Sequence, residues 1–100
     1  MHTGKAGDQG CDFILSKDDR RIAVQAKNMQ GNTGNDAVQE AISAREMKKA
    51  NEAWVVTTAN KFTNKAKELA RGTDVKLFDK KHVLNWMSEA AGELRRKEQN

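Results

Sequence analysis

Proline is absent from this sequence of 100 residues, and cysteine occurs once, at position 11. A single cysteine excludes an internal disulfide, and no Cys/His cluster has zinc-ligand spacing, so Cys11 is expected to be a small buried side chain. No apolar run approaches the roughly 18 residues that a membrane-spanning helix requires. The glycine-rich start also lacks the apolar stretch of a signal peptide. We therefore expect a cytoplasmic protein.

The amino-acid composition indicates a folded, basic domain. Hydrophobic residues make up 37% of the chain and charged residues 32%, which is typical of a globular protein and not of a disordered one. The length suits one domain, residues 1–100, with a single small core. The formal net charge of +4 favours an anionic partner such as nucleic acid, although many basic domains bind none.

Two strands are expected at the start of the chain. Residues 13–15 are a short apolar run, and residues 16–21 are polar and turn-forming. Ile22, Val24 and Ala26 then alternate with Ala23, Gln25 and Lys27. This period of two is typical of a strand with two unlike faces. The pattern predicts a hairpin, followed by a loop over residues 28–35 that is rich in glycine and asparagine.

Helices and strands alternate after this loop. From Asp36 the apolar residues take helical spacing, which predicts a helix of about 15 residues. Residues 53–58 are β-branched and largely apolar, as in a central buried strand. Thr63 can cap a second helix that stops at Gly72, and residues 75–78 form another short strand.

Asp79 is placed to cap the last helix, and the charged end of the chain, residues 93–100, is expected to fray. The apolar residues of this helix keep a 3-4 spacing: Val83, Leu84, Met87, Ala90, Ala91 and Leu94. The order β-β-α-β-α-β-α predicts an α/β fold, a mixed sheet flanked by helices. Its opening hairpin is antiparallel, and its later strands are joined through helical crossovers.

Three polar residues are expected to meet at the hairpin. Gln25 and Lys27 are two positions apart, so they share one face of a strand. If Leu15 lies opposite Ile22, antiparallel counting places Asp12 opposite Gln25. An acid, an amide and an ammonium then converge at one edge of the sheet, where each must be hydrated, paired or bound to a metal.

Two interpretations of this trio remain open from spacing. In the first, oxygens of Asp12, Gln25 and the Ala26 backbone carbonyl hold Mg²⁺ against a phosphodiester. Lys27 then orients the attacking water or stabilises developing negative charge. In the second, which spacing alone favours, Asp12 forms an ordinary cross-strand ion pair with Lys27 or Arg21.

Several blocks in the same order resemble the catalytic domain of Mrr-type restriction endonucleases. They are GDQGCDFIL, IAVQAK, AVQEAISA, AWVVTTANKFTNKAKELA and VKLFDKKHVLNWM, and together they span residues 7–87. That family belongs to the PD-(D/E)xK nuclease superfamily. The resemblance implies a restriction-endonuclease-like fold and metal-dependent hydrolysis of DNA phosphodiester bonds.

The resemblance also assigns roles to the trio. Asp12 is implied to be the principal metal-binding acid, and Lys27 the catalytic lysine. Gln25 stands where the superfamily usually has a second acid, and a glutamine there is a variant found in Mrr-like domains. Because a neutral ligand binds metal more weakly than a carboxylate, we expect activity to need millimolar Mg²⁺ or to prefer Mn²⁺.

Auxiliary residues follow from the same blocks. Asp8 resembles the first acid of the GD-x-G-x-D block, as an auxiliary metal or water contact, although an Asx-type turn explains it equally well. Gln39 resembles the glutamine that accompanies QxK forms, and the resemblance implies that it faces the site from its helix. Contacts to phosphate are expected from the block after the central strand, at Thr58, Asn60, Lys61 and Thr63. Helix capping explains Thr63 equally well, and His82 is expected at the surface or at a helix start.

The largest departure from the family lies at the front of the chain. The family typically opens with a helix that often bears a glutamate near the active site, and this chain starts almost at the GD-x-G-x-D block. We therefore expect a fragment of a longer protein or a partner subunit over the exposed face, with a homodimer favoured. Two alternatives are a nuclease-fold module that binds DNA or protein without cutting, and a junction-resolving nuclease.

Overall fold

The computed structural model describes residues 9–98, and the side chains of residues 12–93. Asp8 and the side chain of Cys11 lie outside the described residues, so their expected roles stay predictions. Within the described part of the chain, no helix is long and apolar enough to cross a membrane.

The chain opens with a long antiparallel hairpin. Strands β1 (Gln9–Lys17) and β2 (Arg20–Asn28) are joined by a tight turn in which Asp18 takes a left-handed conformation, with φ 56°. An aspartate tolerates this conformation better than most residues do. Leu15 pairs with Ile22, the register that the expected meeting of Asp12 and Gln25 assumed. The turn expected over residues 16–21 is wrong at both ends, because residues 16, 17, 20 and 21 are exposed polar residues that belong to the strands.

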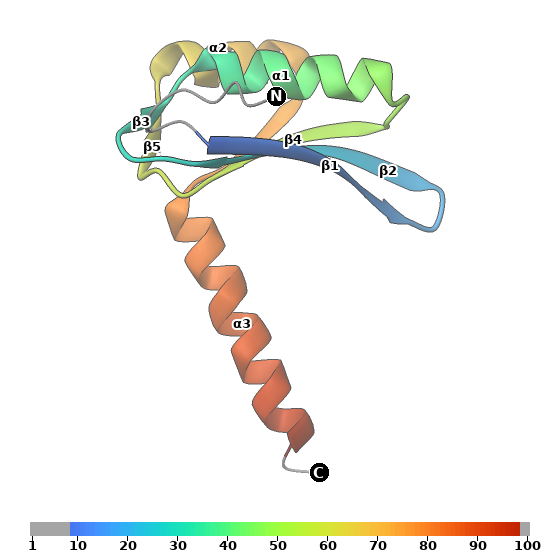
Figure 1. Ribbon diagram of the computed structural model, residues 1–100, viewed down its shortest axis with the longest axis vertical. Helices are drawn as coiled ribbons and strands as arrows, with labels where there is room; N and C mark the ends of the chain where they lie inside the picture. Colours follow the sequence, from blue (N-terminus) through green and yellow to red (C-terminus); the bar gives the residue numbers. More distant parts are fainter. Residues whose placement is uncertain (1–8, 99–100) are drawn as a thin grey trace.

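Helical crossovers extend this hairpin into a mixed sheet (Figure 1). Helix α1 (Asn35–Met47) leads to β4 (Glu52–Thr57), which lies parallel to β2. Helix α2 (Asn64–Thr73) leads to β6 (Val75–Phe78), parallel to β4, and helix α3 (Lys80–Glu98) follows. The strand order β1-β2-β4-β6 confirms the predicted fold class.

A second, two-stranded sheet was not predicted. Strand β3 (Asn32–Thr33) pairs in parallel with β5 (Lys61–Phe62), so the expected loop over residues 28–35 is wrong at its end. Strands of two residues are too short to show a period of two in the sequence. Hydrogen bonds hold the pair in place: the Thr33 and Thr57 hydroxyls lie 2.8 Å apart, and the Thr63 N–H donates to the Thr33 carbonyl at 2.9 Å.

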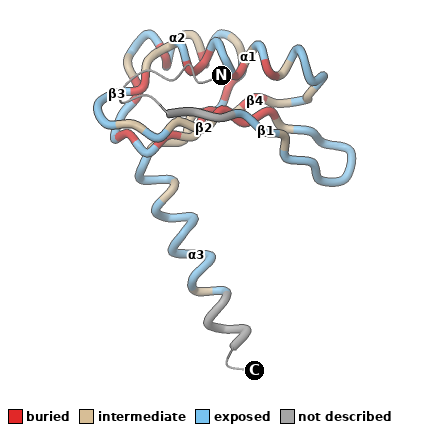
Figure 2. The backbone as a smooth tube through the Cα atoms, in the orientation of Figure 1, coloured by how far each residue is buried: buried red, intermediate tan, exposed pale blue. Residues whose placement is uncertain are grey.

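The core lies between one face of the sheet and the helices α1 and α2 (Figure 2). Many of its members are alanines, whose small side chains let the helices approach the sheet closely. The buried cluster consists of Ala37, Val38, Ala41, Ala53, Val55, Phe62, Ala66, Ala70 and Val75. Side chains of α1 can therefore meet side chains of the sheet only on the face that α1 covers.

The opposite face of the sheet carries a short aromatic row. The ring centroids of Trp54 and Phe78 are 5.0 Å apart, and those of Phe78 and Trp86 are 4.9 Å apart. Beyond this contact α3 points away from the sheet, and most of its described residues are exposed (Figures 1 and 2). Phe13 and Leu15, on β1, are 42% and 43% exposed.

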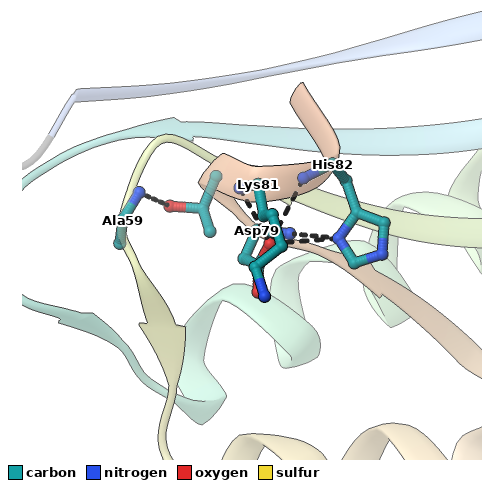
Figure 3. A network of polar contacts seen from close by, with 5 residues as sticks. Ala59, Asp79, Lys81 and His82 are labelled. Atoms are coloured by element: carbon teal, nitrogen blue, oxygen red, sulfur yellow. Dashed lines mark hydrogen bonds and ion pairs between the residues drawn. The ribbon is translucent and has the colours of Figure 1, made fainter. Parts of the chain in front are cut away.

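The starts of the two later helices confirm their predicted caps. The Ala66 N–H donates to the Thr63 hydroxyl at 3.1 Å, at the start of α2. At the start of α3, the Asp79 Oδ1 accepts from the N–H groups of Lys81 (3.0 Å) and His82 (3.4 Å) (Figure 3). The His82 Nδ1 lies 3.0 Å from the same oxygen, so His82 is the helix-start residue that the sequence predicted.

One predicted helix end differs from the structure. Helix α2 passes Gly72 and ends at Thr73, and the left-handed residue that follows is Asp74, with φ 58°. Helix α3 extends into the charged end as far as Glu98, and the fraying of that end stays a prediction.

Candidate active site

The hairpin register brings Asp12 and Gln25 directly opposite each other. Both side chains project from the sheet face that α1 covers. Gln25 is only 6% exposed, although its side chain is polar, whereas Asp12 is exposed. The predicted acid and amide therefore meet at one place, next to the helix that follows them in the chain.

These two residues line a groove of about 680 Å³ between the hairpin and α1. The groove is lined by Asp12, Gln25, Asp36, Gln39, Glu40, Ser43, Ala44, Met47 and Lys48. Gln39 thus faces the same hollow as Asp12 and Gln25, which is where the sequence expected it. Asp36 and Glu40 also line the groove and were not predicted.

Lys27 lies two residues beyond Gln25 and pairs with α1. Its Nζ is 2.8 Å from the Glu40 Oε1, and its side chain is 10% exposed against 49% for Glu40. Arg21, the other cation considered for Asp12, donates to the Lys48 carbonyl at 3.0 Å. Both contacts tie the hairpin to α1 and its end, so neither is a cross-strand ion pair with Asp12.

Glu40 is the functional candidate that sequence reasoning missed. An acid on the exposed side of a helix is usually solvated, so its type alone draws no attention. The available signal was its position next to Gln39, four residues after Asp36, because residues at this spacing share a helix face. Only the packing of α1 against β2 shows that this face meets Lys27.

The predicted phosphate-binding residues lie between the end of β4 and the start of α2. Thr58 follows β4 and joins the end of β2: its N–H donates to the Lys27 carbonyl (3.1 Å), and its hydroxyl donates to the Asn28 Oδ1 (3.0 Å). Asn60 and Lys61 are exposed nearby, around β5. The Thr63 hydroxyl accepts the cap bond of α2, so capping accounts for its local contact.

The oxygen groups predicted to bind metal are of the kind that Mg²⁺ and Mn²⁺ prefer. Of these, the side chains of Asp12 and Gln25 line the groove, and the Ala26 carbonyl belongs to the next residue of β2. Among the described residues, no group of three His, Cys, Asp or Glu side chains could hold an ion. A magnesium site does not need such a group, because Mg²⁺ keeps several waters and takes substrate phosphate oxygens as ligands.

Comparison with known proteins bears on this groove. A family model described as restriction endonuclease, for the Mrr catalytic domain, matches residues 1–87. The matched region includes the hairpin, α1 and the segment after β4, and thus every residue considered above for the site. No curated protein and no solved structure matches the chain.

Proposed function

Because the chain belongs to the Mrr-type restriction endonuclease catalytic family, we propose that it is a metal-dependent DNA endonuclease that hydrolyses phosphodiester bonds. The observation that carries this proposal is the groove beside α1, in which Asp12 and Gln25 lie opposite each other. Lys27 lies two residues further along β2 on the same face of the sheet, where its ammonium contacts Glu40 of α1.

The proposal separates the groups that bind the metal from the lysine that acts on the substrate. The Asp12 carboxylate, the Gln25 side-chain oxygen and the Ala26 carbonyl would hold the ion. When bound, the ion supplies positive charge to the scissile phosphate. The Lys27 ammonium orients the attacking water and stabilises the negative charge that develops on the phosphate oxygens. Gln39 lines the same groove from α1 and is an auxiliary residue of the site. Asp8 is proposed as an auxiliary contact to the metal or to water.

DNA binding is proposed to extend from the groove to the segment after β4. Thr58 sits at the end of β2 through its bonds to Lys27 and Asn28, so a phosphate held there lies near the catalytic lysine. Asn60 and Lys61 add exposed donors along the backbone of the DNA, and Thr63 marks the start of α2, where helix N–H groups can contact a phosphate. The net charge of +4 supports binding of a polyanion in the cytoplasm.

A homodimer is proposed from the face of the sheet opposite α1. Phe13 and Leu15 are exposed there, and so are Leu84, Trp86 and Met87 at the start of α3. Large exposed apolar side chains on β1 and on the start of α3 favour association. A second copy presents the same patch, so a two-fold axis can cover both at once.

Cleavage of supercoiled plasmid with EDTA, Mg²⁺ and Mn²⁺ tests the proposed function. The expected result is conversion of the plasmid to nicked or linear DNA with either metal, and none with EDTA. If the protein retains DNA in a gel and leaves it uncut under all three conditions, the chain is a binding module and the proposal is wrong.

A further inference from the structure

We propose that Glu40 is a positioning residue that holds the ammonium of Lys27 at the proposed active site. This inference rests on the proposed function for its consequence in catalysis. Its structural part, the control of Lys27 by Glu40, can be tested without any cleavage.

The contact itself is short and anchored. The Lys27 Nζ and the Glu40 Oε1 are 2.8 Å apart, the distance of a charge-assisted hydrogen bond. Lysine ends in a compact charge on a flexible four-carbon stem, so its ammonium needs a partner to stay in one place. The Lys27 side chain is only 10% exposed, which also limits its motion.

Glu40 is well placed to supply that partner because α1 is fixed to the sheet. Val38 and Ala41, its neighbours on the helix, are fully buried against the core. Next to this buried stripe, Gln39, Glu40 and Ser43 of the same helix line the groove together with Asp12 and Gln25. The ion pair therefore draws the ammonium toward the wall of the groove that faces the proposed metal ligands.

The charge of Glu40 has a second consequence at the same place. Because Gln25 is neutral, Asp12 supplies the one carboxylate of the proposed ligand set. The positive charge of the Lys27 ammonium beside this set repels a divalent cation. With Glu40 as partner, Lys27 can remain near the ion and the phosphate at a smaller electrostatic cost.

Nitrogen-detected NMR of the lysine ammonium groups tests the structural part on the full chain. Lys27→Arg assigns the Lys27 signal by its loss. In Glu40→Gln the Lys27 signal is expected to shift and broaden, while Glu40→Asp keeps part of the effect. Glu46→Gln removes an exposed acid from the same helix and is the matched control, with no change expected. An unchanged Lys27 signal in Glu40→Gln overturns the proposal.

The catalytic consequence is measured on the same variants. Glu40→Gln is expected to lower kcat by about tenfold or more, with a nearly unchanged KM for DNA, because misplacing a catalytic group costs rate more than binding. Glu40→Asp should recover part of the loss. Equal losses in Glu40→Gln and Glu46→Gln would overturn the proposal.

Metal titration separates positioning from direct ligation. If Glu40→Gln abolishes Mn²⁺ binding in calorimetry while the Lys27 signal stays in place, Glu40 is a metal ligand and the positioning role is wrong. If wild-type protein cuts no DNA, the proposed function fails, and the NMR result still decides whether Glu40 controls Lys27.

Discussion

At the scale of single residues, the site depends on which face of the hairpin each side chain takes. Side chains alternate along a strand, so a register slip of one position would move Asp12 to the face opposite α1. The observed register pairs Asp12 with Gln25 and leaves Phe13 and Leu15 on the other face. One pairing thus separates the polar groove from the apolar patch.

The neutral side chain of Gln25, as a proposed metal ligand, should set the metal requirement. We expect wild-type cleavage to need millimolar Mg²⁺, and Gln25→Glu to lower the half-maximal concentration by about tenfold, because a carboxylate attracts the cation more strongly than an amide. Cleavage rates over a Mg²⁺ titration measure this. Asn85→Asp adds the same charge on exposed α3 and should change nothing. Full wild-type activity at micromolar Mg²⁺ would contradict the prediction.

At the scale of elements, helix starts fix how the segments beside the site leave the sheet. Thr63 ends the segment after β4 and begins α2, and Asp79 begins α3 directly after β6. The Lys80 N–H also donates to the Ala59 carbonyl at 3.0 Å, which ties the start of α3 to the loop after β4. These bonds hold the proposed DNA-binding segment between two helix caps.

Thr63→Ala should cost about 1 kcal/mol of unfolding free energy, because it removes the side-chain acceptor for the Ala66 N–H. Thr63→Ser keeps the hydroxyl and should restore most of the stability. Urea denaturation of the three proteins measures the difference. Unchanged stability in Thr63→Ala, with a loss of DNA affinity, would instead assign Thr63 to phosphate binding.

The cap of α3 should be sensitive to acid. Burial raises the pKa of Asp79, but hydrogen bonds with the side chain and N–H of His82 lower it by more, so the pKa lies below its ordinary value. A depressed folded-state pKa stabilises the fold at pH above the unfolded value, about 4. This contribution is lost as the pH falls through the folded-state pKa.

Asp79→Asn tests this dependence, because asparagine can still cap a helix but carries no charge. Wild-type protein should be more stable than Asp79→Asn near neutral pH. The difference should shrink below about pH 4, as measured by denaturation at a series of pH values. A difference that stays constant down to pH 2 would show that the charge of Asp79 is not involved.

At the scale of the whole molecule, one face of the sheet is covered by two helices and the other by only the start of α3, within residues 9–98 (Figure 1). We expect the full chain to be a dimer through this second face. Leu15→Lys places a charge on it and should give monomers in light scattering, whereas Ser88→Lys adds the same charge to the polar side of α3 and should not. Monomeric wild-type protein would contradict the dimer.

Much of the fold was predictable because its strong patterns are local. The hairpin followed from two strand-like runs on either side of polar residues, although the turn is shorter than expected. The crossovers followed from switches between periods of two and of 3.6 residues. The β3–β5 pair was not predictable, because two residues carry no period. The left-handed residue that follows α2 is Asp74 and not Gly72, because an aspartate also tolerates this conformation.

The site was predictable in part for a similar reason. Asp12 and Gln25 lie on adjacent strands, so counting along the hairpin brings them together. Glu40 lies on α1, and its distance to Lys27 depends on how the helix packs and turns over the sheet. No count along the chain contains that information.

The central claim is that the site made by Asp12 and Gln25 in the groove, with Lys27 two residues further along β2, hydrolyses DNA. The most direct measurement is metal-dependent plasmid cleavage by the wild-type, Asp12→Ala and Lys27→Ala proteins, with circular dichroism to confirm that each is folded. We predict cleavage by wild type alone. Cleavage by folded Asp12→Ala at the wild-type rate would place the active site elsewhere and contradict this account.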